Sequence, residues 1–138
     1  MALLKVGRAA ELLGVGPDTV RRWVDSGRLA ATARQGTGHR LIQSASLAHL
    51  AQELAAEQAS RPRGWESARN RLEGLVTRVV RDHVMAQVEI QSGPHRLVAL
   101  ISREAADELR LEPGVIAVAA VKATSVVVEL PGPPDPAA

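Results

Sequence analysis

The sequence predicts an α+β protein of two small domains, the first helical and the second rich in β-strands. Over residues 6–54 the apolar side chains recur at the three-to-four-residue spacing of helices, whereas over residues 75–130 they alternate with polar ones, as in half-buried strands. The charge divides at the same place, because residues 1–64 carry nine Lys/Arg against five Asp/Glu and residues 65–138 carry eight against ten. This asymmetry indicates a nucleic-acid-binding module joined to a module of another kind.

The expected boundaries follow from composition. Residues 1–56 form the N-terminal domain, 57–64 a polar linker broken by proline and glycine, 65–130 the C-terminal domain, and 131–138 a proline-rich disordered tail. The 138 residues include no cysteine, which excludes disulfides and thiolate metal sites. No apolar run approaches the roughly 20 residues of a membrane span. The start has no signal-peptide core, so we expect a cytoplasmic protein that does not enter a membrane.

Two short helices joined by a glycine-containing turn are expected near the N-terminus. The first closes over Ala9–Leu13 and is broken by Gly14-Val15-Gly16. The second spans Pro17–Ser26 and begins with a proline, whose missing N–H costs nothing at that position. This is the frame of a helix-turn-helix, and its second helix would meet the major groove of DNA. The outward-facing residues of that helix are Asp18, Thr19, Arg21 and Arg22.

A glycine-rich segment, residues 33–42, is expected to form a β-hairpin with cationic edges at Arg34 and Arg40 and with His39 as a turn residue or phosphate contact. With Val6-Gly7-Arg8-Ala9-Ala10 opening the first helix and Thr19-Val20-Arg21-Arg22-Trp23 on the second, residues 3–54 resemble the MerR/excisionase-like winged helix. The resemblance implies binding to double-stranded DNA, normally as a dimer, with the second helix in the major groove and the hairpin on the backbone.

Five strands are expected in the second half, near 72–81, 84–92, 95–102, 115–122 and 125–130. One short helix should occupy Arg103–Leu109, with Ser102 as its N-cap. Five short strands and one helix predict a small OB-like five-stranded β-barrel. The third strand is apolar on both faces, which predicts that it lies in a subunit interface. Its two faces carry Leu97, Ala99 and Ile101 on one side and Val98 and Leu100 on the other.

Two four-residue segments flank this half, Ser67-Ala68-Arg69-Asn70 and Lys122-Ala123-Thr124-Ser125. A tetrahedral oxyanion is bound by donors that converge on it, which backbone amides and short hydroxyls supply while a cation offsets the charge. The hydroxyls here belong to Ser67, Thr124 and Ser125, and Lys122 is the cation. The two segments resemble the two signatures of the Mop domain, a molybdate-binding member of the TOBE superfamily, over about residues 65–130.

The resemblance implies a molybdate or tungstate site made by Ser67, Ala68, Arg69, Lys122, Ala123 and Ser125, with Asn70 contacting the anion or bracing the loop. Ser102 matches a hydroxyl position of the family, and Ala105 stands where the family often has a serine, so one donor is missing. Mop sites lie between subunits or between tandem units. Because this chain has one unit, the second motif would come from another chain of a dimer or of a hexamer built from dimers.

Nothing in the sequence indicates an enzyme. The four histidines have no metal-ligand spacing, and there is no nucleophile elbow, P-loop or dinucleotide fingerprint. The sequence predicts a molybdate- or tungstate-responsive transcription regulator with no metal beyond the molybdenum of the oxyanion. Two alternatives remain. One is a molybdate storage or homeostasis oligomer whose N-terminal module docks a partner. The other is a constitutive DNA-binding oligomer whose Mop-like half serves only assembly.

Overall fold

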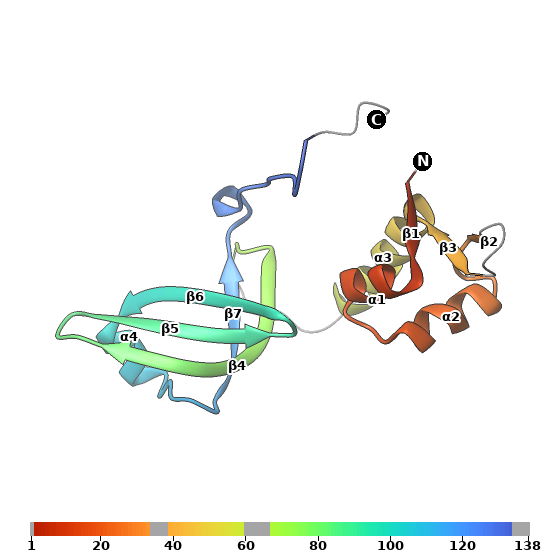
Figure 1. Cartoon of the computed structure of the whole chain (residues 1–138). Coiled ribbons are helices and arrows are strands. Elements are labelled where there is room, and N and C mark those ends of the chain that lie inside the picture. Colours follow the sequence, from red (N-terminus) through yellow and green to blue (C-terminus); the bar gives the residue numbers. More distant parts are fainter. Residues whose placement is uncertain (1, 34–38, 60–66, 134–138) are drawn as a thin grey trace. The chain divides into compact units, whose positions relative to one another are not determined.

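The chain divides into two compact units, and the boundary in the sequence lies after Gly64. The computed structural model (Figure 1) describes residues 2–33, 39–59 and 67–133. Among the helices in these ranges, none has both the length and the apolar character that a membrane span requires.

The N-terminal unit contains three helices and a small antiparallel sheet. In chain order these elements are β1 Leu3–Lys5, α1 Val6–Leu13, α2 Pro17–Asp25, β2 Ala31–Ala33, β3 Arg40–Gln43 and α3 Ser44–Ala59. The two predicted helices are present, and α1 ends where Gly14 adopts a left-handed conformation with φ 68°. The strand order is β1-β3-β2. The strand β1 was not predicted, because three residues are too few to show an alternation.

The core of this unit is built from small aliphatic side chains. Ala9 and Ala10 of α1 are buried, which allows the helix to approach its neighbours closely. Trp23 is half-buried and packs against this core. The buried members are Ala9, Ala10, Val20, Leu29, Ile42, Leu47 and Leu50.

Two parts of the predicted organisation differ or lie outside the described residues. Helix α3 continues to Ala59, so residues 57–59 of the expected linker are helical, while residues 60–64 are not described. The expected hairpin is present as the antiparallel pair β2 and β3. Its connecting loop, which contains Arg34, lies outside the described residues.

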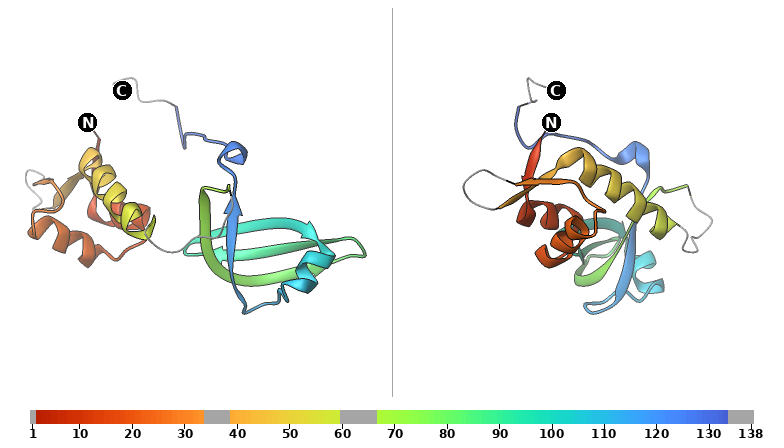
Figure 2. Two further views of the ribbon diagram at one scale, coloured as in Figure 1. Left: turned by 180° about the vertical axis from the view of Figure 1, so that it is seen from behind. Right: turned by 90° about the vertical axis from the view of Figure 1, so that its right-hand side faces the viewer.

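The C-terminal unit is a four-stranded antiparallel sheet with one short helix at one end. Its elements are β4 Asn70–Arg81, β5 Met85–Ser92, β6 His95–Ser102, α4 Arg103–Glu108, β7 Ile116–Val121 and the 3-10 turn η1 Ala123–Ser125. The strand order is β6-β5-β4-β7. The long strand β4 serves two neighbours, since its first half pairs with β7 and its second half with β5 (Figures 1 and 2). The register shifts between Val76 and Arg78, as in a β-bulge that bends the strand.

The predicted fifth strand, 125–130, is not formed, so the described unit is an open sheet of four strands rather than a closed five-stranded barrel. Residues 126–130 have no regular structure, and Val127 and Val128 are 90% and 87% exposed. A strand requires a neighbour to pair with, and within the described chain this segment has none. Val84, predicted inside the second strand, lies instead in the turn before β5 and is 69% exposed.

The core of the sheet lies on one face. Val76, Val88, Ile90 and Leu111 are buried, and Leu97, Ala99 and Ile101 of β6 pack against them. On the other face of β6, Val98 and Leu100 remain 50% and 68% exposed. The alternation predicted for this strand is therefore present, but a single chain covers only one of its two apolar faces.

Candidate oxyanion and nucleic-acid sites

The pairing of β4 with β7 brings the two four-residue motifs together. Asn70 is the first residue of β4 and pairs with Val121, the last residue of β7. The Asn70 side chain fastens this junction, because its Nδ2 donates a hydrogen bond of 3.0 Å to the backbone oxygen of Val121, 51 positions away. Ser67–Asn70 and Lys122–Ser125 consequently lie side by side, and Asn70 braces one against the other.

The second motif leaves its polar side chains on the surface. Lys122 is extended, with φ −63° and ψ 141°, and precedes the 3-10 turn η1. The amide of Ser125 closes this turn by donating to the oxygen of Lys122 at 2.9 Å. The exposed side chains around the junction are those of Ser67, Arg69, Lys122, Thr124 and Ser125, while Ala68 is half-buried. The junction thus presents two cations and three hydroxyls on an open surface.

Ser102 lies elsewhere in the unit. It ends β6 and pairs with Met85, at the end of the sheet where β4 finishes at Arg81, whereas the two motifs meet where β4 begins. Its Oγ accepts the amide hydrogen of Ala105 at 3.0 Å, which confirms its predicted role as the N-cap of α4. One chain does not bring Ser102 to the two motifs.

The turn between β4 and β5 is braced by the carboxylate of Asp82. Oδ1 of Asp82 accepts hydrogen bonds from the amides of Met85 and Val84, at 2.6 and 2.7 Å. The hydrogen bond from Met85 contributes most to a pKa of Asp82 below its ordinary value, and the bond from Val84 and the positive charge of Arg103 lower this pKa further. This side chain therefore braces the turn as a carboxylate. The sequence predicted a turn here but not its cause.

In the N-terminal unit, the outward face of α2 has the expected residues. The side chains of Asp18, Arg21 and Arg22 are exposed and that of Thr19 is half-buried. Each arginine is held by the residue one turn before it, since Arg21 Nη1 lies 2.8 Å from Asp18 Oδ1 and Arg22 Nη2 donates to Thr19 Oγ1 at 3.2 Å. These pairs restrict both guanidinium groups on the face where a recognition helix would meet bases.

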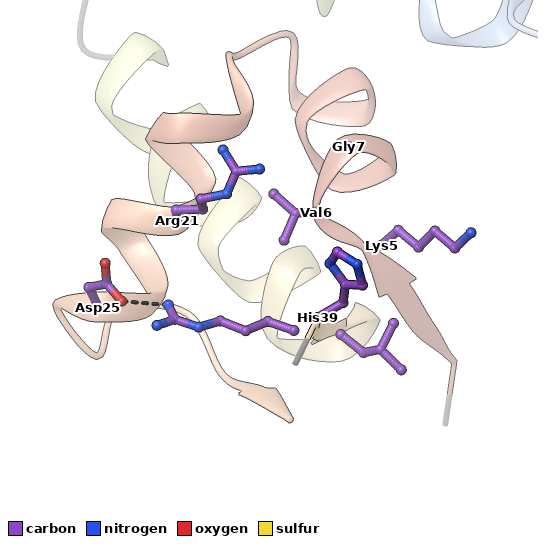
Figure 3. A pocket seen from close by; sticks show the side chains of 8 residues that line it. Lys5, Val6, Gly7, Arg21, Asp25 and His39 are labelled. Carbon is purple, nitrogen blue, oxygen red and sulfur yellow. Dashed lines mark hydrogen bonds and ion pairs between the residues drawn. The ribbon is translucent and has the colours of Figure 1, made fainter. Parts of the chain in front are cut away.

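A cavity of about 570 Å³ adjoins this face of α2. It lies between the start of α1, the outer side of α2 and strand β3, and Figure 3 shows Val6 between Arg21 and His39. Arg40 of β3 donates to Asp25 of α2 at 2.5 Å across one side (Figure 3). The residues that line the cavity are Lys5, Val6, Gly7, Arg21, Asp25, His39, Arg40 and Leu41.

Sequence reasoning named Arg21, His39 and Arg40 but missed Lys5 and Asp25. Lys5 joins the cavity because β1 pairs with β3, placing Lys5 opposite Leu41, and this pairing was not predicted. Asp25 follows Arg21 by four residues on α2, a spacing that places the two on one face and could have been read from the sequence. In the parts of the chain that the structure describes, no cluster of three His, Cys, Asp or Glu side chains could hold a metal ion.

Comparison with known proteins assigns each half separately. Residues 3–55 match a helix-turn-helix domain and residues 66–128 match a TOBE domain. A molybdate-binding protein from Sporomusa ovata is 36% identical over 49% of this chain and 100% of its own, with a TM-score of 0.47. MopII from Clostridium pasteurianum is 32% identical over 47% of this chain and 98% of its own, with a TM-score of 0.45. No curated protein sequence matches the chain.

Proposed function

We propose that this protein is a transcription regulator that binds double-stranded DNA in response to molybdate or tungstate. The proposal starts from the matches of residues 3–55 to a helix-turn-helix domain and of residues 66–128 to a TOBE domain. The observation that carries the proposal is the presence of both domains in one chain, with the two Mop-like motifs held side by side by β4 and β7. We take neither domain to be catalytic.

The junction of the two motifs has the chemistry that a tetrahedral dianion needs. Lys122 and Arg69 supply two positive charges, and the hydroxyls of Ser67, Thr124 and Ser125 supply donors that rotate to meet different oxygens. Ala68 and Ala123 are small enough for their backbone amides to approach the anion closely. Asn70 is already bonded to Val121, so its part is to hold the two segments together. Molybdate and tungstate carry the same charge and shape, and both satisfy this donor set.

We infer that the site is completed by a second copy of the chain. Of the eight residues at the junction, all but Ala68 and Asn70 are exposed. Ser102, the last residue of β6, lies at the end of the sheet opposite to the junction. The outer face of β6 and the segment Val126–Leu130 are apolar and uncovered in one chain. A homo-oligomer, a dimer or a hexamer built from dimers, would cover these surfaces and bring Ser102 of one copy toward the motifs of another.

A shared site couples the anion to assembly by linkage. A ligand that binds only the associated form stabilises it, by about 2.7 kcal/mol when its concentration is 100 times the Kd. In the same way, association raises the affinity for the anion. Because each chain carries one DNA-binding unit, a change in association changes how many of these units act together. We propose that α2 enters the major groove and the β2–β3 hairpin lies on the backbone, as in a MerR/excisionase-like winged helix.

The anion half of the proposal is tested by calorimetric titration of the full chain with molybdate, tungstate, sulfate and phosphate. We expect heat from the first two, and its loss in Lys122→Ala and in Ser67→Ala. Arg78→Ala is the matched control, since it removes an exposed cation from the same unit away from the junction. If molybdate bound equally to all four proteins, the site assignment would be wrong.

The DNA half is tested by selecting bound fragments from a random duplex library, with and without molybdate. We expect one enriched sequence and a change in affinity of at least about fivefold on adding the anion, the lower end of ordinary allosteric coupling. Anion binding without any DNA binding would support a storage protein instead. Equal DNA binding in both conditions would support a constitutive DNA-binding oligomer.

A further inference from the structure

The cavity beside α2 combines charge and size in a way that the oxyanion site does not explain. Lys5, Arg21 and Arg40 reach it from β1, α2 and β3, and among the described residues Asp25 is the only carboxylate that lines it. The lining residues alone, with His39 counted as neutral, carry three cations against one anion, a net charge of +2, while Asp18 pairs with Arg21 from outside the lining. At about 570 Å³ the cavity is far larger than one free tetrahedral ion requires, and has room for a phosphodiester group together with the sugars beside it.

The position of the cavity beside α2 indicates which kind of ligand it binds. Arg21 belongs both to the outward face of α2 and to the wall of the cavity, so the cavity continues the surface that the proposed function places on DNA. Lys5, Arg21 and Arg40 are all exposed, which suits a polymer passing over the surface rather than an enclosed metabolite. Cations that flank a recognition helix ordinarily meet phosphates, which fix the register of a protein on the duplex.

We propose that this cavity receives a phosphodiester group of the DNA backbone, and that Asp25 occupies the place of that phosphate on Arg40 until DNA arrives. The ion pair supports the second part, because the guanidinium of Arg40 already binds a carboxylate oxygen at 2.5 Å across the cavity. A phosphate presents the same kind of acceptor to a guanidinium. Binding therefore exchanges one anion for another on Arg40, while Lys5 and Arg21 gain contacts. This inference rests on the proposed binding to DNA.

The test measures the salt dependence of binding to two labelled duplexes of equal length and unrelated sequence, by fluorescence anisotropy with the full chain. Losing one phosphate contact lowers the slope of log K against log salt by about 0.9. We expect this loss, on both duplexes alike, in Lys5→Ala and in Arg40→Ala. Asp25→Asn should raise the affinity on both, by about twofold to fivefold, the range of an exposed ion pair.

A second ion pair of the same unit supplies matched controls. Arg28 lies 3.8 Å from Glu53 and neither lines the cavity, so Arg28→Ala and Glu53→Gln change the charge equally at another place. If the cavity variants behaved like these controls while the wild type bound DNA, the inference would be overturned and the regulator proposal would stand. A wild-type chain that bound neither duplex would overturn both.

A free anion is the other source of the same chemistry. We expect millimolar inorganic phosphate or molybdate to leave the NMR signals of Lys5 and Arg40 unmoved and to compete with DNA no better than chloride at equal ionic strength. Saturable shifts of these signals by inorganic phosphate, abolished in Lys5→Ala without a change in DNA affinity, would instead assign the cavity to a small anion and overturn the inference.

Discussion

Replacing Gly74 by alanine tests the packing that brings the two oxyanion motifs together. Gly74 lies in β4 opposite Ala117 of β7, four residues after the bracing side chain of Asn70. A Cβ at this position would stand 2.5 Å from the backbone oxygen of Gln91 and 2.7 Å from Cγ2 of Ile90. Ordinary van der Waals contacts begin at 3.4 Å, so the backbone of β5 at Gln91 would have to move away from β4 by almost 1 Å. Backbone pairing on both sides of β4 makes that retreat costly.

The free-energy cost of Gly74→Ala is large compared with the total stability of so small a unit. Overpacking of this kind costs about 1–3 kcal/mol, and a clash with backbone places the expected value near the upper end, about 2–3 kcal/mol. A single core of this size supplies about 3–5 kcal/mol in total. At roughly 4–8 °C per kcal/mol, the midpoint of thermal unfolding should fall by roughly 10–20 °C. The reason is steric, so a larger residue such as Gly74→Val should be worse.

The assay is thermal unfolding of the full chain followed by NMR, which reports the two units separately. Signals of the C-terminal unit should disappear at the lower temperature while those of α1, α2 and α3 persist, and binding of molybdate should weaken in parallel. Glu73→Ala, at the exposed neighbouring position, is the control and should shift stability by no more than about 0.5 kcal/mol. A midpoint in Gly74→Ala within about 2 °C of the wild type would refute the reasoning, since it would show that β4 and β5 separate at little cost.

Three further substitutions test separate features. In Asp82→Asn, the free energy of unfolding should fall furthest below the wild-type value above about pH 5, and the difference should close as the pH falls below the ordinary aspartate pKa of about 4. The reason is that the folded state lowers this pKa by stabilising only the ionised carboxylate. Urea titrations at several pH values measure the difference, and a deficit that did not change with pH would contradict this cause. If Ser102 stabilises α4 as its N-cap, Ser102→Ala should destabilise the C-terminal unit by about 1 kcal/mol, and Ser102→Asp should keep most of the wild-type stability. Equal losses of stability in the two variants would disprove capping. Leu100→Ser should lower the oligomer mass seen by sedimentation, whereas Leu12→Ser, also at an exposed leucine, should not; an unchanged mass would show that the outer face of β6 is not an interface.

The sequence predicted the elements whose cause is local. The boundaries of α2 depend on Pro17 at its start and on a glycine after its end, and both signals act within a few residues. The N-cap of α4 was predicted for the same reason, since Ser102 and Ala105 are three positions apart. The two motifs were recognisable as motifs, although only the β4–β7 register shows that they are neighbours.

What could not be predicted depends on partners distant in the sequence. The run of β-branched residues Val126–Val128 is a genuine strand signal, but a strand forms only where an edge is available, and no sequence pattern reveals whether the edge belongs to the same chain. The cavity beside α2 was missed because it requires Lys5 to lie opposite Leu41, a pairing between segments too short to show a pattern. The bend of β4 likewise accompanies the register shift between Val76 and Arg78, which depends on the pairing with β5.

The place of the second motif explains how a small anion could govern an assembly. Lys122–Ser125 separates the edge strand β7 from the apolar segment Val126–Leu130, which pairs with no strand in the described parts of the chain. The direction in which that segment leaves the sheet is set by the dihedral angles of this one turn, from Lys122 to Val126. Under the proposed function, an anion bound to the turn restricts those angles and so lowers the entropic cost of presenting the segment to a second copy. Ligand and partner would then be coupled through this one turn, and no rearrangement of the sheet would be needed.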